Sequence, residues 1–67
     1  MFDFIFAKSY IDLKYGCRQY LEDSYYDLKK KMEDSNSTIT VRVIDFTGIG
    51  SDTKTFNKSD ISYYGEN

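Results

Sequence analysis

The sequence predicts one small α+β domain, residues 1–67, in which one long helix packs on a mainly antiparallel sheet. Apolar side chains recur at helical spacing between residues 9 and 34, and they alternate with polar ones, as in a strand, between residues 37 and 46. The chain also has no proline, so neither pattern contains a residue that breaks helices or strands. We therefore expect the order β-α-β-β, with a fourth short strand near the end left open.

The first segment, MFDFIF, fits two interpretations. Its three phenylalanines alternate with other residues over 2–7, as in a strand, but two of them also stand at helical spacing with Tyr10. The next stretch, SYID, favours the strand, because Ser9 and Asp12 have nearly the spacing and chemistry of a helix capping box. We expect a strand over 2–7 and a helix that begins near Ser9. In the other interpretation, the helix also takes in residues 2–7.

The predicted helix extends from Ser9 to about Asp34, where the residues DSNS end it. Gly16 lies inside this pattern, although glycine is unfavourable within a helix. The three lysines at 29–31 lie near the C-terminal end, where positive charge interacts favourably with the helix dipole. One stripe of the helix is apolar and would face the sheet; it contains Tyr10, Cys17, Leu21, Tyr25, Leu28 and Met32.

The second half of the chain has the features of strands. In STITVRVIDF, residues 37–46, the side chains of Ile39, Val41 and Val43 would point to one side and the polar ones between them to the other. Residues 53–56 have the pattern of the returning strand of a hairpin, with TGIGSD as the loop. Residues 60–64 fit either a short last strand or a segment packed on the edge of the sheet.

Few residues are suited to catalysis or metal binding. There is no histidine and one cysteine, which excludes a zinc site of the usual kind and an intrachain disulfide. Cys17 has no histidine partner and lies on the apolar stripe, which predicts a small buried residue rather than a nucleophile. TGIGS, residues 47–51, lacks the lysine of a phosphate-binding loop. The spacing of Asp45, Asp52 and Asp60 matches no calcium loop. We expect no enzyme activity, no metal and no cofactor.

The charge of the chain is nearly balanced, with 11 acidic residues, 9 basic residues and a net charge of −2. Nucleic-acid-binding domains usually carry clustered basic residues and a basic isoelectric point, so direct nucleic-acid binding is not expected. The alternative, binding through the lysines at 29–31 and nearby aromatic rings, is opposed by the acidic residues beside them. We recognise no signal peptide and no apolar stretch of about 20 residues, so we expect a cytoplasmic protein with no membrane contact.

The predicted helix has more aromatic surface than one apolar stripe can bury. Away from that stripe, acidic residues alternate with tyrosines, and tyrosine is enriched at protein interfaces because it offers large area and a hydroxyl group. The alternative is that these rings lie flat on the domain surface, as exposed tyrosines commonly do. We predict a protein-binding face on this helix, with tyrosines as anchors and aspartates that attract a basic patch. It consists of Asp12, Tyr15, Gln19, Tyr20, Asp23, Tyr26 and Asp27.

In length and composition, the chain is similar to small proteins encoded by bacteriophages and mobile elements of AT-rich bacteria. Those proteins are rich in Lys, Asn, Asp, Ser and Tyr, and many of them, anti-CRISPR proteins included, inhibit host machinery. Together with the predicted face, the similarity implies a non-enzymatic module that binds a larger host protein and inhibits or modulates it by steric means. If the bound site normally holds nucleic acid, the module would compete for it. The alternative is a self-associating protein, in which a strand edge or the tyrosine face forms a homodimer.

Overall fold

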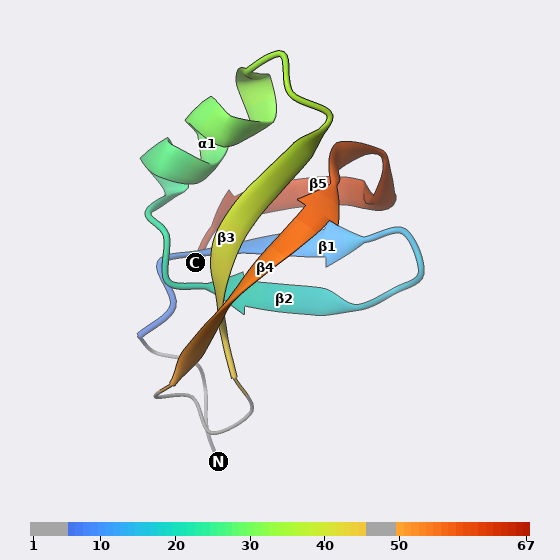
Figure 1. The fold of residues 1–67 in the computed structure, drawn as a ribbon. Helices are drawn as coiled ribbons and strands as arrows, with labels where there is room; N and C mark the ends of the chain where they lie inside the picture. Colours follow the sequence, from blue (N-terminus) through green and yellow to red (C-terminus); the bar gives the residue numbers. More distant parts are fainter. Residues whose placement is uncertain (1–5, 46–49) are drawn as a thin grey trace.

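The computed structural model describes residues 6–45 and 50–67, and it confirms the α+β class (Figure 1). One helix packs on an antiparallel sheet, and the element order is β-β-α-β-β-β in these residues. The elements are β1 (Ser9–Leu13), β2 (Arg18–Leu21), α1 (Tyr25–Glu33), β3 (Thr38–Ile44), β4 (Ser51–Asn57), the 3₁₀ turn η1 (Lys58–Asp60) and β5 (Ile61–Glu66).

The strands form one sheet in the order β4-β3-β2-β1-β5, and every neighbouring pair is antiparallel. β2 and β3 share a single register pair, Leu21 with Val43, and the sheet is strongly twisted where they meet. In Figure 1 the β3–β4 hairpin crosses in front of β1 and β2, and α1 lies across the top. The sheet therefore has an inner face, which packs with α1, and an outer face, on which none of the described elements packs.

The predicted long helix over residues 9–34 is wrong. Residues 9–21 form the β1–β2 hairpin instead, and α1 has nine residues. The turn needs Gly16, whose φ of 95° lies in the left-handed region that favours glycine. Gly16 N–H donates to the carbonyl of Leu13, and Leu13 N–H donates to that of Cys17. The glycine that fitted poorly in the predicted helix is thus the residue that closes the hairpin.

The helix start was misplaced because the same short pattern occurs twice in the chain. Ser9 does not cap a helix; it is fully buried in β1 and its hydroxyl donates to the carbonyl of Asp23 at 2.7 Å. The actual cap is Ser24, whose Oγ accepts the N–H of Asp27 at 3.2 Å. Both SYID and SYYD place an aspartate three residues after a serine, and only the second begins a helix.

The core lies between the inner face of the sheet and α1. Leu28 is the one described α1 residue that is buried, with an exposed fraction of 0%. The predicted orientation of β3 is confirmed, since alternate side chains along this strand are buried. Met32, Phe56, Ile61 and Tyr64 pack against the rim of the core. The core cluster consists of Ile11, Leu13, Leu21, Leu28, Ile39, Val41 and Val43.

Other predictions for single elements have mixed outcomes. The strands expected at 37–46 and 53–56 correspond to β3 and β4. Residues 60–64 fitted either a short strand or a segment packed on the sheet edge, and the structure places most of them in the strand β5. Most of the strand expected at 2–7 falls on residues 1–5, and most of the TGIGS turn on residues 46–49, outside the described residues. Cys17 was predicted to be buried and is exposed, because it ends the hairpin turn rather than lying on a helix.

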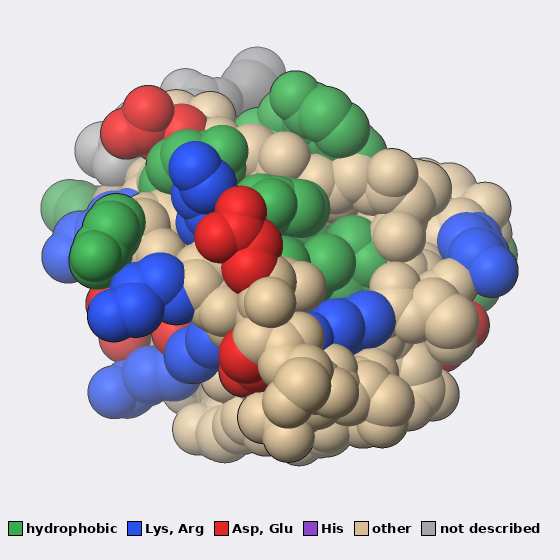
Figure 2. All heavy atoms as spheres, turned by 90° about the horizontal axis from the view of Figure 1, so that it is seen from above, with side chains coloured by type: hydrophobic (Ala, Val, Ile, Leu, Met, Phe, Trp, Pro, Cys, Tyr) green, Lys and Arg blue, Asp and Glu red, His purple; other side chains and the backbone are tan. Residues whose placement is uncertain are grey.

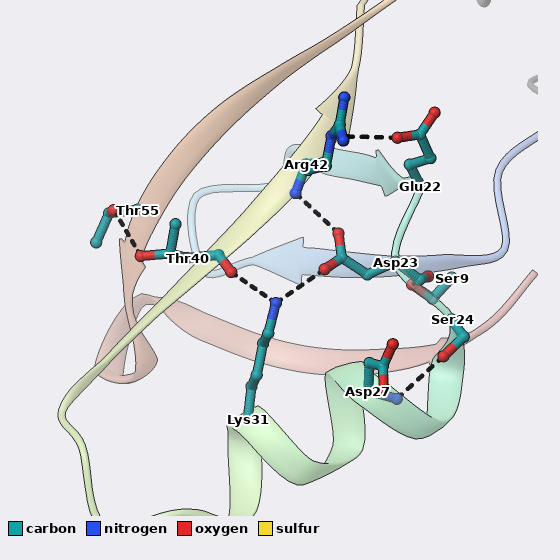
Figure 3. A network of polar contacts seen from close by, with 9 residues as sticks. All are labelled: Ser9, Glu22, Asp23, Ser24, Asp27, Lys31, Thr40, Arg42 and Thr55. Carbon is teal, nitrogen blue, oxygen red and sulfur yellow. Dashed lines mark hydrogen bonds and ion pairs between the residues drawn. The ribbon is translucent and has the colours of Figure 1, made fainter.

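Where β2 ends, the side chain of Asp23 continues the contact with β3 (Figure 3). Glu22 N–H donates to the carbonyl of Arg42 at 2.8 Å, as in an ordinary ladder. The N–H of Arg42 then donates to Oδ1 of Asp23, also at 2.8 Å. A carboxylate oxygen thus replaces the main-chain carbonyl that a longer β2 would supply.

The same carboxylate also attaches the helix. Lys31 Nζ donates to Oδ2 of Asp23 at 2.9 Å and to the carbonyl of Thr40 in β3 at 2.8 Å (Figure 3). Partial burial alone would raise the pKa of Asp23, but the hydrogen bonds from Lys31 and from the Arg42 N–H outweigh it and lower this pKa below its ordinary value. Asp23 and its main-chain bond to Ser9 therefore connect β1, β3 and α1 at one point.

We predict that Asp23→Asn lowers the free energy of unfolding by about 1.5–3 kcal/mol at pH 7, because hydrogen bonds to a charged acceptor are lost. The folded-state pKa of Asp23 is lowered, so its stabilisation is complete above its ordinary pKa and is lost as the pH falls through the lower, folded value. Urea unfolding should therefore show a difference between the two proteins that shrinks below about pH 4.

The control for this experiment is Asp52→Asn, because Asp52 is exposed on β4 and substitutions at such positions usually change stability by no more than about 0.5 kcal/mol. A cost at Asp23 that stays constant from neutral to acid pH would contradict the assigned role of its charge.

Candidate interaction surface

The outer face of the sheet carries a cluster that we call the tyrosine face: Tyr10, Asp12, Arg18, Tyr20 and Tyr63. The cluster spans three adjacent strands, because Tyr10 pairs with Tyr20 across β1 and β2, and Asp12 pairs with Tyr63 across β1 and β5. Side chains alternate between the two faces of a strand, so these residues point away from the core residues Ile11 and Leu13. Strand pairing thus fixes the positions of the cluster.

The three rings are close enough to interact with one another. The centroids of Tyr10 and Tyr20 lie 6.4 Å apart, and those of Tyr10 and Tyr63 lie 6.2 Å apart, both with tilted planes. Tyr10 and Tyr20 are partly buried, whereas Tyr63 is 59% exposed. The cluster is therefore an ordered aromatic surface with one ring that extends well into solvent.

Arg18 lies over the Tyr10 ring and is also bonded to Asp12. Its guanidinium carbon lies 4.0 Å from the centroid of the Tyr10 ring, in cation–π geometry. Nε and Nη2 of Arg18 donate to the two carboxylate oxygens of Asp12 at 2.6 and 3.1 Å. These bonds lower the pKa of Asp12, and the bonds with Asp12 and Tyr20 raise the pKa of Arg18. Both groups remain charged at neutral pH, and together they are electrically neutral.

The absence of a side chain at Gly65 leaves room for the Tyr10 ring. The two residues are register partners across β1 and β5. A Cβ atom on residue 65 would lie 2.7 Å from Oη and 2.9 Å from Cζ of Tyr10, closer than such atoms can approach. The ring therefore occupies the space that any side chain at position 65 would need.

A shallow groove of about 380 Å³ lies on the other side of β5, against α1. The rings of Tyr25 and Tyr64 stack across it, with centroids 6.1 Å apart and planes 29° apart. Figure 2 looks down on the side of the molecule that carries α1, and shows hydrophobic side chains reaching the surface beside charged ones. The groove is lined by Tyr25, Met32, Ile61, Ser62, Tyr63 and Tyr64.

The structure does not bring the seven predicted binding residues onto one surface. Asp12 and Tyr20 belong to the tyrosine face, whereas Gln19 pairs with Ile11 and so lies on the inner face of β2. Tyr15 is in the β1–β2 turn and is 68% exposed. The predicted single helical face is wrong, because residues 12–20 form a hairpin in which neighbours along the chain point to opposite sides.

The remaining three predicted residues follow β2. Asp23 is committed to Arg42 and Lys31, so its carboxylate has a structural role. Tyr26 and Asp27 are exposed in the first turn of α1, and the Lys30 ammonium lies 5.2 Å from the centroid of the Tyr26 ring. These two could still contact a partner, and their part in protein binding stays a prediction.

Three residues of the tyrosine face were not among the predicted binding residues. Tyr10 was assigned to the apolar stripe of the predicted helix, Tyr63 to a segment of open structure, and Arg18 to no site at all. The signal that could have identified Tyr10 is the alternation of SYIDL, in which the first, third and fifth residues are buried. Placing Tyr63 beside Tyr10 requires the β1–β5 register, which no local pattern supplies.

The chemistry available to the described residues is limited. No group of three or more His, Cys, Asp or Glu side chains in them is arranged to hold a metal ion. No helix among residues 6–45 and 50–67 has the length and apolar character needed to cross a membrane.

Comparisons with protein-family models, curated proteins and solved structures give no match to this chain. Inferences about function therefore depend on the geometry of its surfaces.

We predict that Gly65→Ala lowers the free energy of unfolding by about 1–3 kcal/mol, because the new methyl group displaces the Tyr10 ring from its contacts. In a Tyr10→Ala background, the same change should cost at least about 0.5 kcal/mol less, because the ring that it meets is gone. Urea unfolding of the four proteins of this cycle measures the coupling. Additive effects would show that Gly65 is needed for another reason.

Proposed function

We propose that this protein is a small non-enzymatic module that binds a larger protein through the tyrosine face and modulates it by occupying a surface. The observation that carries the proposal is the outward-facing cluster of three tyrosine rings and one arginine on adjacent strands, with Tyr63 as its most exposed ring. Tyrosine and arginine are the residue types, with tryptophan, that dominate binding energy at protein interfaces. Their positions are set before binding, so little conformational entropy is lost on association.

Charge favours a protein over a nucleic acid as the occupant of this face. Single-stranded nucleic acid is usually bound by aromatic rings inside a positively charged groove. Here Arg18 is paired with Asp12, and Arg42, also on an outward position, is paired with Glu22 at 3.2 Å. The net charge of the chain is −2. A neutral aromatic surface fits a partner surface of mixed character, on which the Tyr63 ring could enter a pocket.

The mode of action that fits such a module is steric, as expected from the sequence. Three aspartates were expected to steer association. Asp12 and Asp23 form ion pairs within the chain, and Asp27 is the one of the three that is exposed. Inhibition of a host protein, and competition for a nucleic-acid site as in the phage proteins of similar composition, are the specific forms of modulation that we propose. Both require a partner that keeps binding when nucleic acid is removed.

The test is an affinity capture from a bacterial lysate with the tagged chain as bait, with and without nuclease, followed by mass spectrometry. We expect one stoichiometric partner that persists after nuclease treatment. Tyr63→Ala should weaken its binding by about 2 kcal/mol or more, roughly thirtyfold in Kd. Tyr26→Ala is the matched control, because both rings are well exposed, at 59% and 67%, but Tyr26 lies on α1.

The two variants separate the possible binding surfaces. Loss of the partner with Tyr26→Ala and retention with Tyr63→Ala would move the binding site to the first turn of α1. Recovery that disappears with nuclease would replace the protein partner by a nucleic acid. Either result would overturn the proposal that a larger protein binds the tyrosine face.

A further inference from the structure

The two edges of the sheet are protected to different degrees. An edge strand presents unpaired backbone groups, and proteins commonly block such strands with charged residues, above all lysine. The β4 edge has Asp52 and Lys54 within SDTKTFN, both exposed. The β5 edge, ISYYGE, has one charged residue, Glu66, at its end. Among the described residues, β5 is thus the edge that is open to another strand.

The register of β5 shows which of its backbone groups face outward. Asn67 N–H donates to the carbonyl of Lys8 in line with the β1–β5 register, in which Ser9 pairs with Glu66. In an antiparallel ladder, residues alternate between bonding one neighbour and bonding the other. Tyr63 and Gly65 therefore bond toward β1, and the N–H and C=O groups of Tyr64 and Glu66 point to the open side. The register shifts between Asp12 and Leu13, so Ser62 is the extra residue on β5, and its hydroxyl donates to the carbonyl of Asp12.

These outward groups are complementary to themselves. If two β5 strands pair antiparallel about Tyr64, each Tyr64 faces its counterpart, and Ser62 of one copy faces Glu66 of the other. The two Tyr64 residues then form a hydrogen-bonded pair at the two-fold axis, and the outward N–H of each Glu66 faces the other copy. No pair opposes two like charges, because Glu66 meets an uncharged serine.

We propose that β5 is a self-association edge, at which a second copy of this chain adds its own β5 to make one continuous sheet across a two-fold axis. The groove beside β5 supports this occupant. Its lining includes Tyr25 and Met32 of α1 and Ile61 and Tyr64 of β5, so it accepts the aromatic side chain that a Tyr64–Tyr64 pair places there. Backbone pairing and side-chain packing thus favour the same arrangement.

A second copy fits this edge better than an unrelated peptide does. An extended peptide needs only the backbone groups of β5, whereas the pairing of Tyr64 with Tyr64 beside the groove and the absence of like charges across the axis follow from the sequence of β5 itself. The interface is one strand and a shallow groove per copy, so we expect a weak dimer of the kind formed by small interfaces. The inference does not depend on the proposed binding of a larger protein.

The experiment is sedimentation equilibrium of the 67-residue chain from about 1 μM to about 1 mM, the range in which a weak dimer dissociates. The mass should rise from that of the 7.9 kDa monomer toward twice that value. Glu66→Pro removes an outward N–H at each of two sites in the dimer and should raise the dissociation constant at least tenfold. Its fold is checked by circular dichroism.

The matched control is Thr53→Pro on the opposite edge. Lys58 N–H donates to the carbonyl of Ser37 and Asp45 N–H to that of Gly50, so the same alternation leaves the N–H of Thr53 on the outer side of β4. This substitution also removes one outward N–H and should leave the dissociation constant unchanged. Equal weakening by both proline variants would overturn the assignment of the interface to β5.

A charge series tests the register without a proline. Ser62→Glu would oppose Glu66 of the other copy and weaken the dimer about two- to tenfold, because like charges directly opposite are destabilising. Adding Glu66→Lys to Ser62→Glu should restore association. A monomer at every concentration, or a dimer that the charge series does not change, would overturn the proposal.

Discussion

The arrangement of this small domain depends on the carboxylate of Asp23. β2 and β3 pair in register at one position only, and then the chain leaves the sheet to begin α1. By accepting the Arg42 N–H and the Lys31 ammonium, Asp23 keeps β3 beside the end of β2 and attaches the helix to both (Figure 3). Without a disulfide, a chain of 67 residues has few other means of holding two hairpins and a helix in one orientation.

The small size of the core explains why several tyrosines lie outside it. A core with one buried helix residue, Leu28, and short strands fills with aliphatic side chains from β1, β2 and β3. Tyrosine carries a hydroxyl group that needs water or a partner, so the rings of β1, β2 and β5 are stable on the outer face, where they also contact one another and Arg18. Five of the seven tyrosines therefore lie on the outer face of the sheet or in the groove, and the other two, Tyr15 and Tyr26, are exposed in the β1–β2 turn and on α1.

The sequence predicted the second half of the fold well and the first half poorly, for a physical reason. Residues 38–44 alternate apolar and polar side chains over seven positions, so the strand period is clear. Residues 9–13 and 18–21 are too short for a period of two to be separated from helical spacing, and SYID imitates a helix start. The decisive residue was Gly16, because a turn with positive φ is the best use of a glycine at that position.

Only part of the candidate surface could be predicted from the sequence, because the register between strands decides which side chains lie together. Two of the seven predicted binding residues, Asp12 and Tyr20, are in the tyrosine face. Strand pairing places them there, and not the helical spacing from which they were predicted. Tyr10 and Tyr63 lie near opposite ends of the sequence and meet because β5 pairs with β1. The aromatic content of a sequence can indicate that rings reach the surface, but which residues lie together there depends on long-range strand pairing.

The order of the sheet also determines how the surfaces relate to one another. β5 contributes Tyr63 to the outer face, Tyr64 to the groove and its backbone to the open edge. Because alternate residues of one strand serve the two faces, a second strand added at this edge would extend both surfaces without rearranging either. A partner bound on the outer face and a second copy bound at the edge would therefore contact the same strand, and each would restrict the motion of the segment that the other uses.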